Sequence, residues 1–252
     1  MTDPAWLQLK SIALHDEGDQ PSAPWPDGAS PEYIEARRAL EKAEAELRDH
    51  IKAVAARRRE LPPGAVVGDH RLTEGPRDLA ADGPDRPVTL VELFGDQDAL
   101  VVYHLMFHPD DDQACPMCSM WVDALHGVSH HIARRAAFAV VAKAPIAKLR
   151  RWGRERGWQG LRLVSSYGTS FNADLHMEGP AGGQWPAVSV FQREPGQGGQ
   201  VRHVLSQTAS STVIAAGGGI DLLNPVWHVW DLLPAGRGEW LPDNDYPGAT
   251  RG

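Results

Sequence analysis

Two cysteines three positions apart, in Cys115-Pro116-Met117-Cys118, are the side chains with the clearest potential for chemistry. A pair this close is not a disulfide framework of the kind that joins distant loops. If a helix begins at Pro116, both sulfurs lie on its first turn, where free backbone N–H groups and the helix dipole stabilise a thiolate. We expect Cys115 to attack a disulfide and Cys118 to resolve the mixed disulfide. The pair indicates redox or metal chemistry, the alternative being two inert core residues.

Histidine and aspartate residues near the cysteines support a second interpretation, a metal site. The chain before Cys115 contains His108-Pro109-Asp110-Asp111-Asp112. Nearby carboxylates raise the pKa of a thiol but tolerate a bound cation. His108, Cys115 and Cys118 offer ligands suited to copper or zinc, with His104 as a fourth. If residues 104–108 are extended, about 13 Å separates the Cα atoms of the two histidines, so His104 joins the site only if the chain bends.

The dithiol is expected to lie where a buried strand meets a helix. Residues 100–107 form a continuous apolar run, typical of a central strand covered on both faces. Pro116 suits the first position of a helix predicted over 116–134. A second buried strand over 137–142 and a helix over 145–156 complete a βαβα run, which indicates an α/β domain. Further strands are predicted at 65–67, 187–192 and 201–205, the last two as a hairpin with its turn at 195–199.

A long amphipathic helix is predicted before this domain. Ser30 is a suitable N-cap for a helix that begins at Pro31. We place the helix at 31–62, after a loosely packed arm at 1–30 and before a domain at 63–252 that includes a C-terminal extension. The helix has an apolar stripe that packs either on the domain or on a second copy, in a homodimer through residues 31–60. Its members, spaced by three and four, are Tyr33, Ala36, Leu40, Ala43, Leu47, Ile51 and Val54.

The overall composition limits the partners and the compartment. The net charge is -8, so the chain has no positive field for nucleic acid. No apolar stretch approaches the ~18 to 20 residues of a membrane span, and the N-terminus lacks the basic flank of a signal peptide. A close cysteine pair fits a reducing compartment. We therefore expect a cytoplasmic protein without nucleic-acid or membrane partners.

Several short motifs together are characteristic of one family. From about Arg38 to Glu239 the chain resembles a thioredoxin-like bacterial family of predicted dithiol-disulfide oxidoreductases whose function is otherwise unknown. The resemblance implies a thioredoxin-like central mixed sheet flanked by helices, with the long N-terminal helix and a C-terminal extension added. The motifs are Val102-Tyr103-His104-Leu105-Met106-Phe107, Cys115-Pro116-Met117-Cys118-Ser119, Ser165-Ser166, Phe171-Asn172-Ala173-Asp174 and Asp231-Leu232-Leu233-Pro234.

Resemblance to thioredoxins in general implies two further site residues. Trp185-Pro186-Ala187 resembles the segment in which thioredoxins place a cis-proline opposite the dithiol, which would put Pro186 in the substrate groove. His104 lies on the strand beneath the site, near the position of a buried acid that moves protons for the resolving cysteine. The alternative for His104 is a core histidine. Trp121, beside the dithiol, is expected in the core or in the groove wall.

Three functions follow from these observations. The leading hypothesis is a thiol-disulfide oxidoreductase that requires no cofactor and acts on a small-molecule or protein disulfide. Its catalytic residues would be Cys115, Cys118 and His104, with Pro186 and Trp121 binding substrate. The second is a mononuclear copper or zinc protein, an oxidase or a metal carrier, that uses the cysteines with His108 and His104. The third is a non-catalytic binding module that dimerises through the long helix.

Overall fold

The computed structural model describes residues 23–194, 200–208, 223–239 and 241–245. The turn predicted at 195–199 and most of the arm predicted at 1–30 lie outside the described residues. The chain divides into two compact units, residues 1–60 and residues 61–252, which we treat separately. Among the described residues, no helix combines the length and the apolar character needed to cross a membrane.

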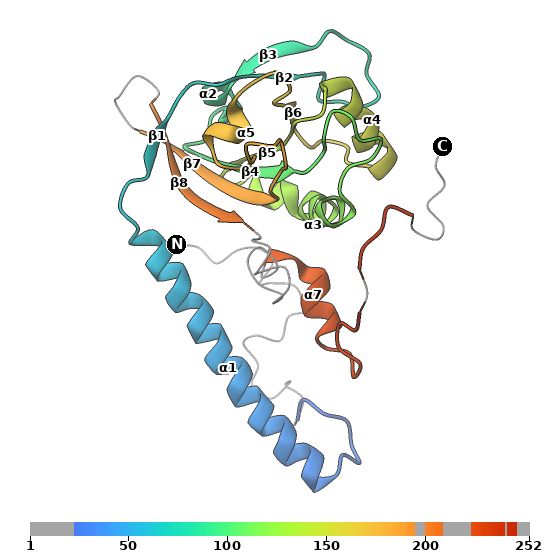
Figure 1. The fold of residues 1–252 in the computed structure, drawn as a ribbon. Helices are drawn as coiled ribbons and strands as arrows, with labels where there is room; N and C mark the ends of the chain where they lie inside the picture. Colours follow the sequence, from blue (N-terminus) through green and yellow to red (C-terminus); the bar gives the residue numbers. More distant parts are fainter. Residues whose placement is uncertain (1–22, 195–199, 209–222, 240, 246–252) are drawn as a thin grey trace, which may run out of the picture. The chain divides into compact units, whose positions relative to one another are not determined.

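The first unit contains one long helix, α1 (Pro31–Arg59) (Figure 1). The side chain of Ser30 caps its N-terminus by accepting a hydrogen bond of 3.2 Å from the N–H of Tyr33. This start was predicted from the sequence and is confirmed. The helix ends three residues before the predicted limit at 62, because the residue before a proline avoids helical backbone angles and Pro62 follows Leu61. No residue of α1 is buried.

The second unit is built on one mixed sheet of eight strands (Figure 1). The central strands β4, β5 and β6 are parallel, and every other neighbouring pair is antiparallel. This is the thioredoxin-like α/β arrangement expected from the sequence, including the β7–β8 hairpin. In sheet order the strands are β1 (Ala65–Val67), β8 (Val201–Thr208), β7 (Ala187–Arg193), β4 (Ala99–Leu105), β5 (Ala137–Ala142), β6 (Leu163–Ser165), β2 (Arg71–Glu74) and β3 (Arg86–Thr89).

Helices connect the parallel strands and flank the sheet. Parallel strands need a crossover, which α3 (Pro116–Ile132) provides from β4 to β5 and α4 (Ile146–Arg156) from β5 to β6. Pro145 is the N-cap of α4 and not its first residue. The remaining described helices are α2 (Leu90–Leu93), α5 (Phe171–Asp174) and α7 (Pro225–Trp230).

Side chains on the two faces of the sheet form two separate cores. Successive side chains of a strand point to opposite faces. On β4, Tyr103 and Leu105 belong to the core that contains residues of α3 and α4, which we call the α3 core. Leu100 and Val102 belong to the core that contains residues of α2 and α5, which we call the α2 core. A residue's position along β4 therefore determines whether it lies on the side of the dithiol.

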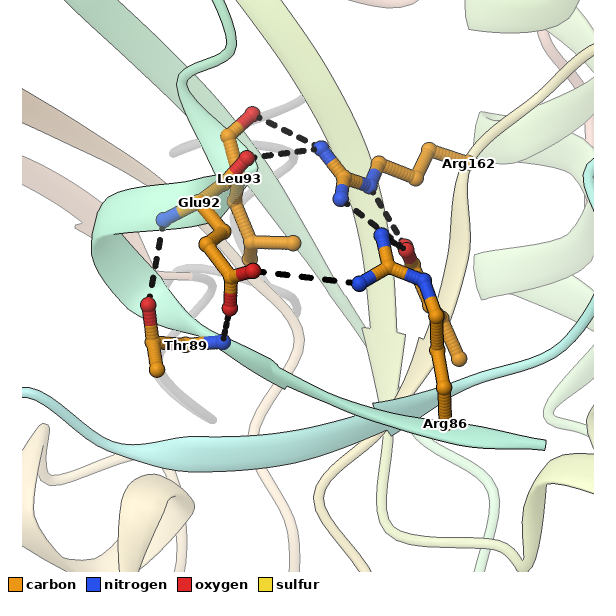
Figure 2. Close-up of polar contacts among 6 residues, drawn as sticks. Arg86, Thr89, Glu92, Leu93 and Arg162 are labelled. Atoms are coloured by element: carbon orange, nitrogen blue, oxygen red, sulfur yellow. Dashed lines mark hydrogen bonds and ion pairs between the residues drawn. The ribbon is translucent and has the colours of Figure 1, made fainter.

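A buried ion pair joins β2 to the segment before β6 (Figure 2). Arg162 donates to Glu74 at 2.7 Å, and both side chains are at most 7% exposed. The same guanidinium donates to the carbonyls of Glu92 and Leu93 at 3.2 and 3.1 Å. These carbonyls end α2, where a helix leaves its acceptors without internal partners. Arg86 of β3 also contacts Glu74, so one cluster links β2 and the edge strand β3 to α2 and to the segment before β6.

Candidate active site at the dithiol

Backbone hydrogen bonds fix Cys115 at the junction of β4 and α3. Cys115 is the N-cap of α3 and Pro116 is its first residue, as predicted. The N–H of Cys115 donates to the carbonyl of Met106 at 3.0 Å, and the N–H of Ser119 donates to the carbonyl of Cys115 at 2.9 Å. The chain that leaves β4 therefore returns to the end of the same strand before the helix begins.

The two thiols differ in access to solvent. Cys115 is partly exposed, whereas Cys118 is 1% exposed and lies within the α3 core. Cys115 lines a pocket of about 570 Å³, within the range of small-molecule sites. The other lining residues are Met106, Phe107, His108, Asp111, Gln113, Ala114, Pro116, Gly182, Gly183, Gln184 and Asn244.

The pKa values of the two thiols shift in opposite directions. A hydrogen bond with the Cys118 thiol is the largest of the effects that lower the pKa of Cys115 to about 6. The backbone N–H groups of Cys118 and Met117 act in the same direction, and burial opposes them. Burial raises the pKa of Cys118 well above its usual value, and the neighbouring Cys115 raises it further. The side chain of Cys115 does not cap α3 with a hydrogen bond. The Cys118 thiol is therefore the main group that stabilises the Cys115 thiolate.

Tyr103 contacts the buried thiol, a role that the sequence did not reveal. It is fully buried in the α3 core and stacks on Trp121 with ring centroids 6.2 Å apart. Its hydroxyl acts on the Cys118 thiol and favours the charged form of that thiol. With the Met106 backbone it opposes the dominant effect of burial, which raises the pKa of that thiol. Tyr103 is therefore placed to stabilise negative charge on Cys118.

The acidic loop does not have the expected effect on the dithiol. Asp110, Asp111 and Asp112 are all exposed, and only Asp111 lines the pocket. None of the three contributes to the pKa shift of Cys115, which is downward and not upward. Water screens exposed charges, so the carboxylates beside the site do not oppose a thiolate as the sequence suggested.

His104 lies on the wrong face of the sheet to move protons for Cys118. Its neighbours Tyr103 and Leu105 face the dithiol, so His104 points into the other core. There it stacks on Phe171 with ring centroids 5.8 Å apart, and its Nε2 lies 2.9 Å from Oγ of Ser189. Burial, with a smaller effect of the His203 charge, lowers the pKa of His104 to about 3. The expected shuttle role is corrected to that of a neutral core histidine.

Neither expected substrate-binding residue lines the pocket. All peptide bonds of the described residues are trans, including the bond before Pro186, so the cis-proline expectation is wrong. Pro186 is buried next to β7, and residues 182–184 line the pocket in its place. The N–H of Gly179 donates to the carbonyl of Gly183 at 2.8 Å, which closes the loop that carries this segment. Trp121 is 1% exposed, which makes it a core residue and not a groove wall.

The proposed metal ligands are not assembled into a site. Among the described residues, no group of three or more histidine, cysteine or acidic side chains could hold a metal ion. His108 lines the pocket with Cys115, but its Nδ1 accepts a hydrogen bond of 3.2 Å from the N–H of Asp110. His104 lies across the sheet and Cys118 lies in the core. The four residues named from the sequence therefore do not converge on one point.

Polar groups distant in the sequence complete the pocket. The N–H of Phe107 donates to Oε1 of Gln184 at 3.0 Å, which ties the 182–184 segment to the end of β4. The Asn244 side chain donates to the carbonyl of Ala114 at 3.0 Å, next to Cys115. No local pattern indicates such contacts, which span 77 and 130 positions. The pair Gly182-Gly183, which allows close backbone approach, is the one sequence signal at this wall.

Solved structures similar to this chain share little sequence with it. Reduced Prx3 from Vibrio vulnificus, in complex with H2O2, is 12% identical, with 67% of this chain and 98% of that chain covered and a TM-score of 0.44. AhpC from Mycobacterium bovis is 14% identical, with 72% and 98% covered and a TM-score of 0.44. AhpC from Enterococcus faecalis is 10% identical, with 59% and 81% covered and a TM-score of 0.44.

The family of the chain is shown by its sequence. No curated protein matches it. A family described as a bacterial protein of unknown function, DUF899, matches residues 26–248. This range includes α1, the whole described sheet, both cysteines and Asn244, and the match agrees with the resemblance read from the motifs. The chain therefore belongs to the DUF899 family of bacterial proteins of unknown function.

Proposed function

We propose that this protein is a thiol-disulfide oxidoreductase in which Cys115 is the nucleophile and Cys118 the resolving thiol. The observation that carries the proposal is the asymmetry of the dithiol. Cys115 opens into a pocket and has a lowered pKa, whereas its hydrogen-bonded neighbour Cys118 is buried and has a raised pKa. A thiol with a pKa near the ambient pH combines thiolate content with nucleophilicity.

The reaction is a two-electron exchange. The Cys115 thiolate attacks one sulfur of a substrate disulfide, the substrate S–S bond breaks, and one substrate thiolate leaves and takes up a proton. Cys118 then loses its proton and attacks the Cys115 sulfur, which releases the second substrate thiol. The dithiol is oxidised to a Cys115–Cys118 disulfide and the substrate is reduced to two thiols. An external thiol or dithiol must reduce the protein disulfide to complete the cycle.

The pocket has a volume and polar groups suited to a small-molecule disulfide. The pocket of about 570 Å³ has walls from the end of β4, from residues 182–184 and from Asn244. Gln113, Gln184 and Asn244 provide amide groups that can bind a polar substrate. The chemistry needs no metal or organic cofactor, and a reducing compartment such as the cytoplasm would keep the dithiol ready to react.

Trapping of the mixed disulfide tests the proposal. We expect Cys115→Ser to lose disulfide reduction altogether. Cys118→Ser should stop after the first step and carry one substrate half on Cys115, visible by intact-protein mass spectrometry. Met117→Leu is the matched control, because Met117 acts on the thiol only through its backbone N–H. Full activity of the Cys115→Ser protein would contradict the proposal.

Elemental analysis of the same preparation separates this function from the metal hypothesis. After purification without oxygen or chelator, we expect two titratable thiols and copper and zinc well below one ion per chain. One protected ion per chain, lost together with activity in His108→Ala, would show that the metal hypothesis is correct and the dithiol cycle is not.

A further inference from the structure

The apolar stripe of α1 has the spacing of a coiled-coil seam. Tyr33, Leu40, Leu47 and Val54 are each seven residues apart. A strict seven-residue repeat keeps apolar side chains in line along a left-handed pair of helices. The first three are 52%, 51% and 59% exposed, and no residue of α1 is buried. A helix of 29 residues presents this seam over about 43 Å.

The charges of α1 are divided between its two halves. Residues 31–46 contain five acidic and three basic side chains, a net charge of -2. Residues 47–59 contain one acidic and five basic side chains, a net charge of +4. Two parallel copies would place like-charged halves together, whereas two antiparallel copies place the acidic half of each beside the basic half of the other. The charge distribution therefore selects one orientation.

We propose that α1 pairs with α1 of a second copy in an antiparallel homodimer. A twofold axis midway between Leu40 and Leu47 sets Leu40 against the partner's Leu47 and Tyr33 against the partner's Val54. Such an interface uses the same surface of both copies and closes at two chains. The small side chains Ala36 and Ala43, on the same stripe, allow the helices to approach closely. The inference does not depend on the dithiol chemistry.

The oligomeric state of the full chain provides the first test. We expect a dimer by analytical ultracentrifugation, and a monomer for the double variant Leu40→Glu/Leu47→Glu. Ala45→Glu is the control, since it adds one negative charge on the opposite side of the helix and should remain dimeric. A wild-type monomer would overturn the proposal and would indicate that the stripe is covered within one chain. A double variant that is still dimeric would place the interface elsewhere and also overturn it.

Cross-linking tests the orientation without disturbing the leucines. In a Cys115→Ser/Cys118→Ser background, one chain carries Tyr33→Cys and another carries Val54→Cys. Antiparallel pairing predicts oxidative cross-linking in the mixture of the two chains and none in either chain alone. Cross-linking of each chain to itself, with none between them, would show a parallel pair and overturn the antiparallel orientation.

Discussion

The dithiol and the Glu74–Arg162 cluster both contain buried polar groups, but these groups differ in the hydrogen-bond partners that they find. Arg162 donates four hydrogen bonds, two to Glu74 and two to the carbonyls that end α2 (Figure 2). Cys118 is as deeply buried, yet its main partner is another thiol, and the charge of that thiol raises its pKa. The cluster pairs opposite charges, whereas the dithiol divides one negative charge unequally between two sulfurs.

The difference shows how one fold separates stability from reactivity. A buried charge that is fully hydrogen-bonded and paired has no reason to exchange protons or attack a substrate. In the proposed function, the Cys115 thiolate keeps its reactivity, because the thiol that stabilises it is also the next reactant. We therefore expect changes in the cluster to alter folding and changes in the dithiol to alter chemistry.

The largest expected effect is the difference in reactivity between the two cysteines. With a pKa of about 6, Cys115 is mostly thiolate at pH 7, whereas Cys118 is almost entirely protonated. At pH 7, thiolate content alone predicts alkylation at least ~100-fold faster at Cys115 than at Cys118. The Cys115 rate itself should fall about tenfold for each pH unit below 6. Iodoacetamide labelling followed by peptide mass spectrometry measures both rates. Equal rates at pH 7 would remove the asymmetry on which the comparison depends.

Loss of the cluster should mainly reduce stability. Arg162→Met leaves Glu74 as a buried charge with only Arg86 as a partner, which is expected to cost about 3–5 kcal/mol in the free energy of unfolding. Arg86→Met is the control, because that side chain is 55% exposed and its removal leaves Glu74 paired with Arg162, so we expect a smaller loss. Urea unfolding measures both. Similar losses in the two variants would mean that burial does not distinguish the two arginines.

His104 should make the protein sensitive to acid without taking part in the reaction. Its pKa is about 3 in the folded state and ~6.5 when unfolded, so between these values the unfolded state binds a proton that the native state does not. Stability then falls by up to about 1.4 kcal/mol for each pH unit below 6.5. His104→Gln should remove this slope in urea unfolding at pH 7.5 and 5, whereas His50→Gln, on exposed α1, should not. An unchanged slope would mean that His104 is already protonated in the folded state.

The Tyr103 hydroxyl should affect a single step of the proposed reaction. Tyr103→Phe removes the contact that favours negative charge on Cys118 while keeping the ring in the core. A hydrogen bond to a charged group is worth about 1.5–3 kcal/mol, so the resolving step should slow at least about tenfold. The lifetime of the mixed disulfide measures this step, and alkylation of Cys115 should be unchanged. A variant that slowed both equally would indicate a packing defect and not a role in resolution.

Local sequence determined the elements around the dithiol. The apolar run at 100–107, Pro116 after Cys115, and the strand at 137–142 each carry a signal that needs no distant contact, and all three are confirmed. Strands β2 and β3 were not predicted, because four-residue strands containing arginine, glutamate and proline have too short an alternation to recognise. Their formation depends on pairing with each other and with β6.

The sequence by itself determined the family, the cysteine pair and the helix that begins beside it, because all three rest on neighbouring residues. Only the tertiary structure decided which residues surround the two cysteines. The face on which His104 lies depends on the register of β4 in the sheet, and one position separates it from Tyr103 on the side of Cys118. Gln184 and Asn244 reach the pocket from distant positions. These two residues come close to Cys115 only through the tertiary fold, and no local sequence pattern encodes that proximity.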